Sequence, residues 1–476
     1  MQETSDSSTP PSRGWPDYRA VWRWHFYAGM FCVPFVIILS ITGTIYLFKP
    51  QIEAWNDRAY DNLQDVGERA GSRTQVEAAL AAVPGSTFQA CEFPTATNNA
   101  TRVLVDHSGE STRVYVHPAT SQVLYVRPDE SGIIPLVKRI HGELMIGNNG
   151  SHIVELAACW TVVMILSGLF LWWPRNAKGL GGIIYPRFNG GSRMFWRDIH
   201  GVTGVWISSL ALFLVITGLP WANFWGEYFK GLRRLTGTAV AKQEWSTGSE
   251  SSKTVETAES GKHKGHAGHE SGGGGGGPWR RRKGVAVSPE QLDAIDRVIA
   301  AVAPLDLAPP VLISPSAEKP SQWDVASMTP NRPLRVNLVV DGASGEIVSR
   351  KGFQDRHIFD RAVGTGIAIH EGQMFGWLNQ LLALLTTSGL VLLSVSGVVL
   401  WWRRRNLGVL GAPAVGMNPR LSWGLVAFVA LLGIALPLFG ASLIIVLICE
   451  RFFLRRIPPV KRWLGLRGSD AQLAAE

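Results

Sequence analysis

Long apolar stretches alternate with polar segments along the 476-residue chain. A helix needs about 20 consecutive, mainly apolar residues to cross a bilayer. Five stretches approach or exceed that length, and the last is broken by Pro437 and Gly440, so it forms either one tilted helix or a helical hairpin. The five stretches are residues 26–48, 153–173, 201–221, 378–402 and 421–449. The pattern therefore predicts an α-helical membrane protein.

Two polar segments, one between the first and second spans and one between the third and fourth, share a pattern. Each has a helix-like stretch, at 75–83 and at 290–302. Alternating apolar and polar runs bounded by turn residues follow, as in 113–116 and 335–340. We predict a small α+β domain in each segment. Residues 245–284, which are rich in Ser, Lys, His and Gly, are expected to form a disordered external loop.

Basic residues in the short loops predict the orientation, because Lys and Arg favour the cytoplasmic side. The residues counted are Arg13, Arg19 and Arg23 before the first span, Arg175, Lys178, Arg187, Arg193 and Arg197 between the second and third, and Arg403, Arg404 and Arg405 after the fourth. They place the N-terminus and both loops in the cytoplasm. The apolar run after the polar N-terminus lacks a small-residue cleavage pattern, so we expect an uncleaved anchor.

The predicted organisation is two repeats of a transmembrane helix, a soluble α+β domain and a second transmembrane helix, followed by a C-terminal hydrophobic helix or hairpin. Its segments are 1–24 (cytoplasmic N-terminus), 25–48 (first span), 49–135 (first outer domain), 136–173 (interfacial segment and second span), 174–198 (cytoplasmic loop), 199–221 (third span), 222–365 (second outer domain), 366–402 (interfacial segment and fourth span), 403–420 (cytoplasmic loop), 421–449 (fifth span or hairpin) and 450–476 (basic tail).

Composition agrees with a membrane protein. Hydrophobic residues make up 46% of the chain and charged residues 17%, and the 19 Trp suit the aromatic belts that lie at lipid headgroups. The net charge of +9 comes from basic residues beside apolar runs and not from one basic face, so the expected partner is the lipid bilayer and no nucleic acid.

The same residue types recur at the same spacings in the two halves, which indicates an internal duplication. His25 is followed by Gly29 and by Gly43 of a Thr-Gly pair, and His200 is followed at identical offsets by Gly204 and by Gly218 of a second Thr-Gly pair. His141 is followed by Gly147, by Gly168 of a Ser-Gly pair and by Trp172, and His370 is followed at identical offsets by Gly376, Gly397 and Trp401. Because positions 25, 29 and 43 are separated by nearly whole helical turns, this histidine and its glycines form one stripe on their helix, as do those of the second copy.

We interpret the four repeated histidines as the ligands of two haem b groups. The predicted orientation pairs His25 with His200 at the cytoplasmic side and His141 with His370 at the outer side. Two imidazoles on each iron leave no open coordination position, which suits electron transfer. Gly29 and Gly204 would leave a smooth strip for a flat macrocycle, and Arg23 and Arg197 would pair with haem propionates.

Plainer interpretations remain open for the same residues. A histidine near a membrane boundary can simply lie at the interface, and glycine often lets two helices pack closely in lipid. His152 opens the second span and is the main competitor as a ligand, but its counterpart in the second half is Leu381. The three histidines of the long insertion, His263, His266 and His269, could grip a metal ion, although a solvated linker explains them as well.

Several stretches together resemble the PepSY-associated transmembrane family of iron-regulated membrane proteins. They are His25–Gly29, Ile140–Met145, Leu171–Arg175, Arg197–Gly201, Thr217–Trp221 and Ile369–Gly372. The resemblance covers nearly the whole chain and implies PepSY domains outside the bacterial inner membrane. The family that it points to includes di-haem reductases that act on ferric siderophores. The insertion at 245–284 departs from the usual pattern.

The expected function is therefore a di-haem electron carrier that reduces siderophore-bound Fe(III) on the periplasmic side. The sequence contains no glycine fingerprint between a strand and a helix for a nucleotide cofactor, so a cytoplasmic reductase or quinol would supply the electrons. Two alternatives remain: a membrane-anchored PepSY protein that binds or regulates a partner without redox activity, and a transporter of siderophore or metal.

Overall fold

The computed structural model describes residues 18–64, 66–174, 179–238, 284–317, 319–413 and 423–466. Arg13, Arg175, Lys178, the three histidines of the insertion and all but the last residue of the predicted loop 245–284 lie outside the described residues. The chain divides into two compact units. The first comprises Met1–Ile37, Glu155–Val215 and Gly389–Glu476, and the second comprises Ile38–Val154 and Ile216–Ser388.

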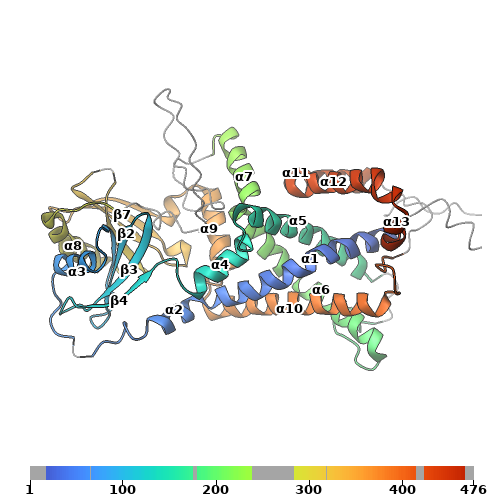
Figure 1. Cartoon of the computed structure of the whole chain (residues 1–476), viewed down its shortest axis with the longest axis horizontal. Helices are drawn as coiled ribbons and strands as arrows, with labels where there is room; N and C mark the ends of the chain where they lie inside the picture. The colour runs from blue at the N-terminus through green and yellow to red at the C-terminus, as the bar shows by residue number, and fades with distance from the viewer. Residues whose placement is uncertain are drawn as a thin grey trace, which may run out of the picture. The chain divides into compact units, whose positions relative to one another are not determined.

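Five helices of the described chain are long and apolar enough to cross a membrane, which makes the protein a multi-pass membrane protein. They are α1 (Tyr18–Leu47), α5 (Gly147–Trp172), α6 (Gly191–Gly218), α10 (Trp377–Arg404) and α12 (Pro437–Phe452), where short 3-10 turns extend the spans of α6 and α12 to Trp221 and Arg456 (Figure 1). Helices α1 and α6 begin earlier than the predicted spans, at Tyr18 and Gly191 instead of 25 and 199, because a helix continues beyond its most apolar part.

The second unit contains an eight-stranded antiparallel sheet in the order β4-β3-β2-β1-β5-β6-β7-β8 (Figure 1). The strands are β1 (Thr87–Glu92), β2 (Thr101–His107), β3 (Glu110–Val116), β4 (Val123–Pro128), β5 (Val311–Pro315), β6 (Gln322–Ser327), β7 (Val336–Asp341) and β8 (Ile347–Gly352). Each polar segment supplies four strands, but the segments do not form separate sheets. Strand β1 pairs with β5, with Cys91 opposite Ile313. This pairing removes two open edges that would otherwise expose unpaired backbone groups.

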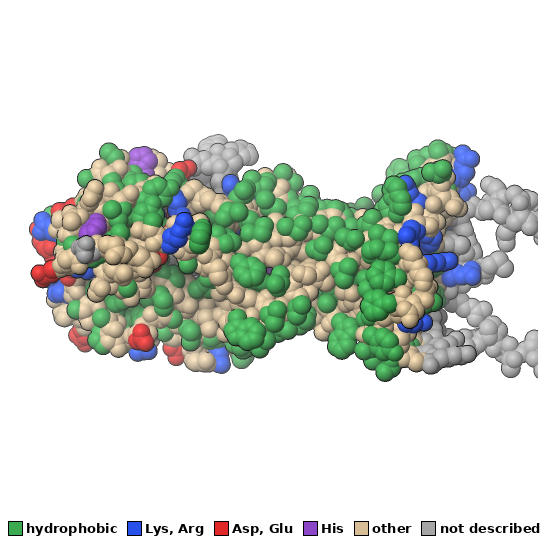
Figure 2. Space-filling model, turned by 90° about the horizontal axis from the view of Figure 1, so that it is seen from below, with side chains coloured by type: hydrophobic (Ala, Val, Ile, Leu, Met, Phe, Trp, Pro, Cys, Tyr) green, Lys and Arg blue, Asp and Glu red, His purple; other side chains and the backbone are tan. Residues whose placement is uncertain are grey.

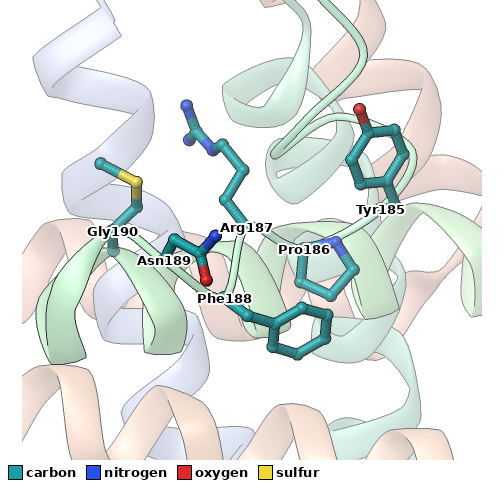
Figure 3. A pocket seen from close by; sticks show the side chains of 7 residues that line it. Tyr185, Pro186, Arg187, Phe188, Asn189 and Gly190 are labelled. Atoms are coloured by element: carbon teal, nitrogen blue, oxygen red, sulfur yellow. The ribbon is translucent and has the colours of Figure 1, made fainter.

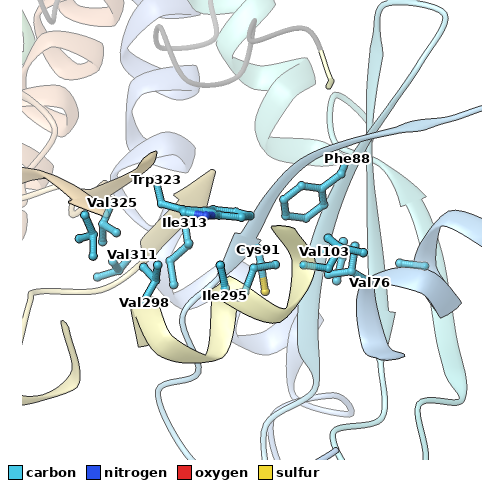
Figure 4. Close-up of a cluster of buried hydrophobic side chains, with 14 of the residues drawn as sticks. Val76, Phe88, Cys91, Val103, Ile295, Val298, Val311, Ile313, Trp323 and Val325 are labelled. Carbon is cyan, nitrogen blue, oxygen red and sulfur yellow. The ribbon is translucent and has the colours of Figure 1, made fainter. Parts of the chain in front are cut away.

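Helices α3 (Ser72–Ala82) and α8 (Pro289–Val302) cover one face of this sheet. Their apolar sides and the alternate residues of the central strands form one buried core, to which both polar segments contribute. Figure 4 shows the rings of Phe88 and Trp323 turned toward each other in this core, and their centres lie 6.3 Å apart. The first turn of α8 is closed by a capping box between Ser288 and Gln291.

Shorter helices join the sheet to the spans. Helix α2 (Lys49–Asp57) follows α1, while α4 (Ile133–Glu143) and α9 (Ile358–His370) lead from β4 and β8 toward α5 and α10. Helix α7 (Asn223–Leu235) follows the end of α6. Elements therefore occur in the same order in both halves: a helix, four strands, a short helix and a span.

The C-terminal apolar stretch is broken into α11 (Trp423–Ala435) and α12 at Leu436, whose φ of −125° and ψ of 79° are not helical. Pro437 begins α12 because its ring and missing N–H suit the first turn of a helix. Gly433 and Gly440 approach each other so closely that a Cβ on Gly440 would lie 2.9 Å from the carbonyl oxygen of Gly433. A short helix, α13 (Pro458–Leu464), follows.

The helices carry the outer surface expected of membrane spans. Figure 2 shows hydrophobic side chains spread over the surface of the helices, with Lys and Arg gathered at one end of the first unit. Arg403, Arg455 and Arg456 belong to the first unit and are exposed. Large apolar side chains are exposed throughout α12, and Ile444 and Ile445 have about 60% of their surface uncovered. Apolar surface of this extent fits lipid and not water.

Candidate paired histidine sites

Two of the repeated histidines meet inside the first unit. His25 of α1 and His200 of α6 have ring centres 6.3 Å apart, and the planes of the two imidazoles stand at 82°. Both side chains are held in place on their Nδ1 side by the neighbouring helices. His25 and His200, which the sequence analysis predicted to form a pair, are therefore neighbours in the structure.

The same pair of groups binds each of these imidazoles. Nδ1 of His25 lies 3.1 Å from the carbonyl oxygen of Met164 and 3.1 Å from Oγ of Ser167, both on α5. Nδ1 of His200 lies 3.2 Å from the carbonyl oxygen of Leu393 and 3.1 Å from Oγ of Ser396, both on α10. A carbonyl oxygen can only accept, so Nδ1 carries the proton in both rings. Nε2 then carries the lone pair that can bind a metal.

Glycine allows each imidazole to lie close against its neighbouring helix. A Cβ on Gly168 would lie 3.1 Å from Cε1 of His25, and a Cβ on Gly397 would lie 3.4 Å from Cε1 of His200. The first of these distances is tighter than ordinary van der Waals contact. The Ser-Gly pair that recurs in α5 and α10 therefore serves the histidine of a different helix, since its serine bonds the imidazole and its glycine makes room for it.

A second pair of sites occurs in the second unit with Thr-Gly in place of Ser-Gly. Oγ1 of Thr42 lies 2.9 Å from Nδ1 of His141, and Oγ1 of Thr217 lies 3.0 Å from Nδ1 of His370. The Thr42 hydroxyl donates its own proton to the carbonyl oxygen of Ile38 at 2.7 Å, so it accepts a hydrogen bond from His141. Nδ1 of His141 is therefore again the protonated nitrogen.

The glycines of these pairs lie against the same two rings. A Cβ on Gly43 would be 3.3 Å from Cε1 of His141, and a Cβ on Gly218 would be 3.5 Å from Cε1 of His370. The sequence interpretation placed Gly43 on one strip with His25 and Gly218 on one strip with His200. The structure also puts each of them against the imidazole of His141 or His370, because these two histidines lie on short helices packed beside the ends of α1 and α6.

The imidazole of His141 has a lowered pKa. Burial lowers the pKa of its imidazole to about 4, and the nearby His370 acts in the same direction, while a backbone hydrogen bond at Leu39 acts against both. The indole ring of Trp221 stands edge-on to His370 with ring centres 5.8 Å apart. A neutral imidazole is the form that binds a metal.

The two arginines expected to hold propionates have protein partners. Arg23 donates to the carbonyl oxygen of Pro413 at 2.9 Å, and Arg197 binds the carboxylate of Asp198 at 3.1 Å. The side chain of Arg197 is 62% exposed. A guanidinium has five N–H donors, so these contacts leave the expected pairing with propionates a prediction.

Gly29 and Gly204 have ordinary surroundings. A Cβ on Gly29 would meet only Sδ of Met164 at 3.9 Å, and a Cβ on Gly204 would meet Cδ2 of Leu393 at 3.6 Å. Both neighbours are residues next to the imidazole sites, since Met164 and Leu393 supply the carbonyl oxygens that bind His25 and His200. His152, the competing ligand, is exposed at the start of α5.

The hydroxyl partners of the histidines were missed from the sequence, although the signal for them was present. Ser167, Ser396, Thr42 and Thr217 each precede a glycine at an offset repeated in both halves. The sequence interpretation used only the glycines. A hydroxyl before each glycine, repeated four times beside four repeated histidines, could have indicated the hydrogen bonds.

A pocket in the loop before α6 offers no comparable chemistry. It has a volume of about 530 Å³ and is lined by residues 185–190 and Met194. Figure 3 shows Tyr185 and Phe188 at its wall. The guanidinium of Arg187 is bound to both carboxylate oxygens of Asp198, at 2.7 and 3.0 Å. The charged side chain in this lining is therefore already neutralised.

Fold and sites together define a class: a multi-pass helical membrane protein with an antiparallel sheet and repeated, partly buried histidines. A family model described as the PepSY-associated TM region matches residues 22–404, and the chain belongs to that family. This confirms the resemblance that the sequence motifs indicated. A search among curated proteins found no match.

Proposed function

We propose that the protein is a di-haem transmembrane electron carrier that reduces ferric iron, held by a siderophore, on the periplasmic side of the bacterial inner membrane. His25 and His200 would hold one haem b, and His141 and His370 the other. Haem held by two imidazoles supplies a one-electron couple with no open coordination position.

The spacing of the first pair carries the proposal. A metal ion lies about 2 Å from an imidazole nitrogen, and each nitrogen lies about 1 Å from its ring centre, so two imidazoles on opposite sides of one ion have centres about 6 Å apart. The centres of His25 and His200 are 6.3 Å apart. Ring pairs packed edge to face also have centres about 4.5–7 Å apart, so what favours a ligand role beyond this spacing is the identical set of Nδ1 partners in both copies.

The protein groups around the imidazoles would fix them as ligands. Ser167 and Ser396, with the adjacent carbonyl oxygens, orient two rings, and Thr42 and Thr217 orient the others. Such outer hydrogen bonds select the tautomer whose Nε2 faces the metal and raise its basicity. The lowered pKa of His141 favours the neutral imidazole, which is the form that binds a metal.

The reaction that we propose is the transfer of one electron to chelated Fe(III), which gives Fe(II). Hard oxygen donors of a siderophore hold Fe(III) far better than the softer Fe(II), so reduction releases the metal. A cytoplasmic reductase or quinol would supply the electron. Two sites near opposite faces would carry it across the bilayer.

We also infer that the two halves arose by duplication and that the N-terminus faces the cytoplasm. The order of elements and the four matching histidine environments support the first point. The basic residues around the loop before α6 and the end of α10 support the second. The sheet would then lie in the periplasm.

Absorption spectra test the haem sites. The purified protein, produced in cells supplied with a haem precursor, is expected to show a sharp reduced α-band after dithionite and about two haems per chain. His200→Ala should lose one haem and keep the other. His152→Ala is the matched control, because that exposed residue is expected to leave both haems in place. A folded preparation without porphyrin would contradict the proposal and leave a membrane-anchored sheet domain.

Iron reduction is tested separately. Protein that has been reduced and freed of dithionite is mixed with a ferric siderophore and an Fe(II)-trapping dye. We expect one Fe(II) for each electron stored, and a parallel return of the reduced α-band to the oxidised spectrum. A haem-loaded protein that stays reduced in the presence of several ferric chelates would retain the electron carrier but refute Fe(III) as its acceptor.

A further inference from the structure

Helix α7 carries an exposed apolar stripe. Phe224, Tyr228, Leu232 and Leu235 are 44%, 39%, 47% and 87% exposed. At about 100° of turn per residue, the four side chains occupy one arc about 80° wide. The helix is strongly amphipathic, and yet part of its apolar side faces outward.

The opposite side of α7 is firmly fixed within the second unit. Gly226 and Arg233 are buried there. The Arg233 guanidinium binds both carboxylate oxygens of Asp360 on α9, at 2.7 and 3.0 Å, and the rings of Phe229 and Phe359 meet edge-on. The apolar stripe therefore belongs to a helix held by its other face, and not to a detached segment.

The exposed half of α7 is itself divided by polarity. Glu227 and Arg234 are exposed on one flank, whereas Tyr228 and Leu232 are exposed on the other. Leu232 and Arg234 lie about 160° apart around the helix axis. If water surrounded the exposed half of α7 completely, its apolar and charged side chains would not need to be separated on two flanks. A helix between an apolar medium and water does require this separation.

The position of α7 in the chain identifies the apolar medium. The span that includes α6 ends at Trp221, and α7 begins at Asn223. The chain thus reaches the end of a membrane span just before α7. With 13 residues, α7 is about 20 Å long, which is too short to cross a bilayer.

We propose that α7 is an interfacial helix that lies in the headgroup layer of the bilayer where α6 ends. Tyr228, Leu232 and Leu235 insert toward the acyl chains, and Glu227 and Arg234 remain in water. The Arg233–Asp360 pair joins this lipid-bound helix to α9, whose last residue is His370. The inference goes beyond electron transfer and does not depend on bound haem.

Fluorescence quenching tests the lipid contact. Leu232→Cys and Arg234→Cys are made in the full-length chain, labelled with an environment-sensitive dye and placed in vesicles of phosphatidylcholine and phosphatidylglycerol. Lipids with a nitroxide near the headgroup serve as quenchers. The unsubstituted protein, labelled in the same way, gives the signal of the native cysteines. We expect blue-shifted emission and several-fold stronger quenching at position 232 than at 234.

Two results would overturn the proposal. Equal, water-like emission at both positions would mean that α7 faces solvent. Blue-shifted emission at position 232 without lipid quenching would mean that protein covers the stripe, either another segment of this chain or a second copy. Leu235→Cys provides a second variant on the same arc if Leu232→Cys does not fold, and it is expected to give the same quenching.

Discussion

The imidazole of His25 stands edge-on to that of His200, with the ring centres 6.3 Å apart and the planes at 82°. These residues lie in different halves of the sequence, and each ring is bound at Nδ1 by a hydroxyl and a carbonyl from a neighbouring helix. This spacing between two oriented, partly buried imidazoles is the relationship on which the proposed chemistry depends. The predictions below test it and its surroundings.

Gly168→Ala should weaken the site at His25. The added methyl group would lie 3.1 Å from Cε1 of the imidazole, so the ring or α5 must shift. Overpacking typically costs about 1–3 kcal/mol, which corresponds to roughly tenfold weaker haem binding. Haem content per chain after extensive washing measures the effect. Gly424→Ala on α11 is the control, because its methyl group would meet nothing within 4 Å, and an equal loss in both variants would contradict a specific role for Gly168.

Thr42→Val should loosen the site at His141 and leave the site at His25 intact. The substitution keeps the side-chain volume but removes the oxygen that accepts from Nδ1 at 2.9 Å. Loss of such an outer partner typically costs about 10–100-fold in metal affinity. Haem titration followed by difference spectra measures it. Thr44→Val is the matched control on the same helix, since its hydroxyl binds Ser40 and Thr387 and no histidine.

Asp360→Asn should destabilise the second unit much more than a surface change does. Its partner Arg233 is 2% exposed, so the substitution leaves a buried cation without its countercharge, at a typical cost of about 3–5 kcal/mol. Thermal unfolding in detergent measures the difference. Glu77→Gln removes an exposed ion pair with Arg73 and should cost at most about 1 kcal/mol. Similar losses of stability in both variants would show that the buried Arg233–Asp360 ion pair stabilises the protein no more than an exposed ion pair does.

Glu92→Gln should remove one pH-dependent contribution to the stability of the sheet. Burial raises the pKa of the Glu92 carboxyl, and Arg113 and Arg102 lower it less than burial raises it. The folded state therefore favours the protonated acid, and this contribution is fully present below the ordinary carboxyl pKa of about 4.3. It is lost as the pH rises through the folded pKa.

Unfolding curves recorded from pH 4 upward, an interval that starts near the ordinary carboxyl pKa of about 4.3, test this effect. The wild-type protein should lose stability relative to Glu92→Gln as the pH rises, because the amide has no proton to release. An unchanged difference between the two proteins across the whole range would show that Arg102 and Arg113 fully compensate the buried charge.

Some of the site could be inferred from the chain alone because it is repeated. Residues that recur at equal spacings in two halves must satisfy the same requirement twice, so His25, His141, His200 and His370 stood out without any coordinates. The spacing could not show which glycine meets which ring. Gly43 follows His25 on one helix, but it touches His141, because α4 packs its last turn beside the end of α1.

The sheet likewise shows that contacts between distant segments could not be predicted from the sequence. Alternation of apolar and polar residues predicted strands in both polar segments, since that pattern depends only on neighbours in the chain. The pairing of Cys91 with Ile313 joins strands from opposite halves of the chain, and nothing local favours one shared sheet over two separate ones. The single shared sheet forms because the pairing of β1 with β5 satisfies backbone groups that would be unpaired at the edges of two separate sheets.

By itself, the sequence determined that this protein crosses the membrane several times, because the length of an apolar run must match the thickness of the bilayer. Through its internal repetition it also singled out four histidines, whose Nδ1 atoms all have hydrogen-bond partners in the structure. Only the tertiary structure decided the partners of Nδ1, the shared sheet and the exposed stripe of α7. These are contacts between distant segments, and they depend on packing, hydrogen-bond geometry and burial that no single stretch of chain contains.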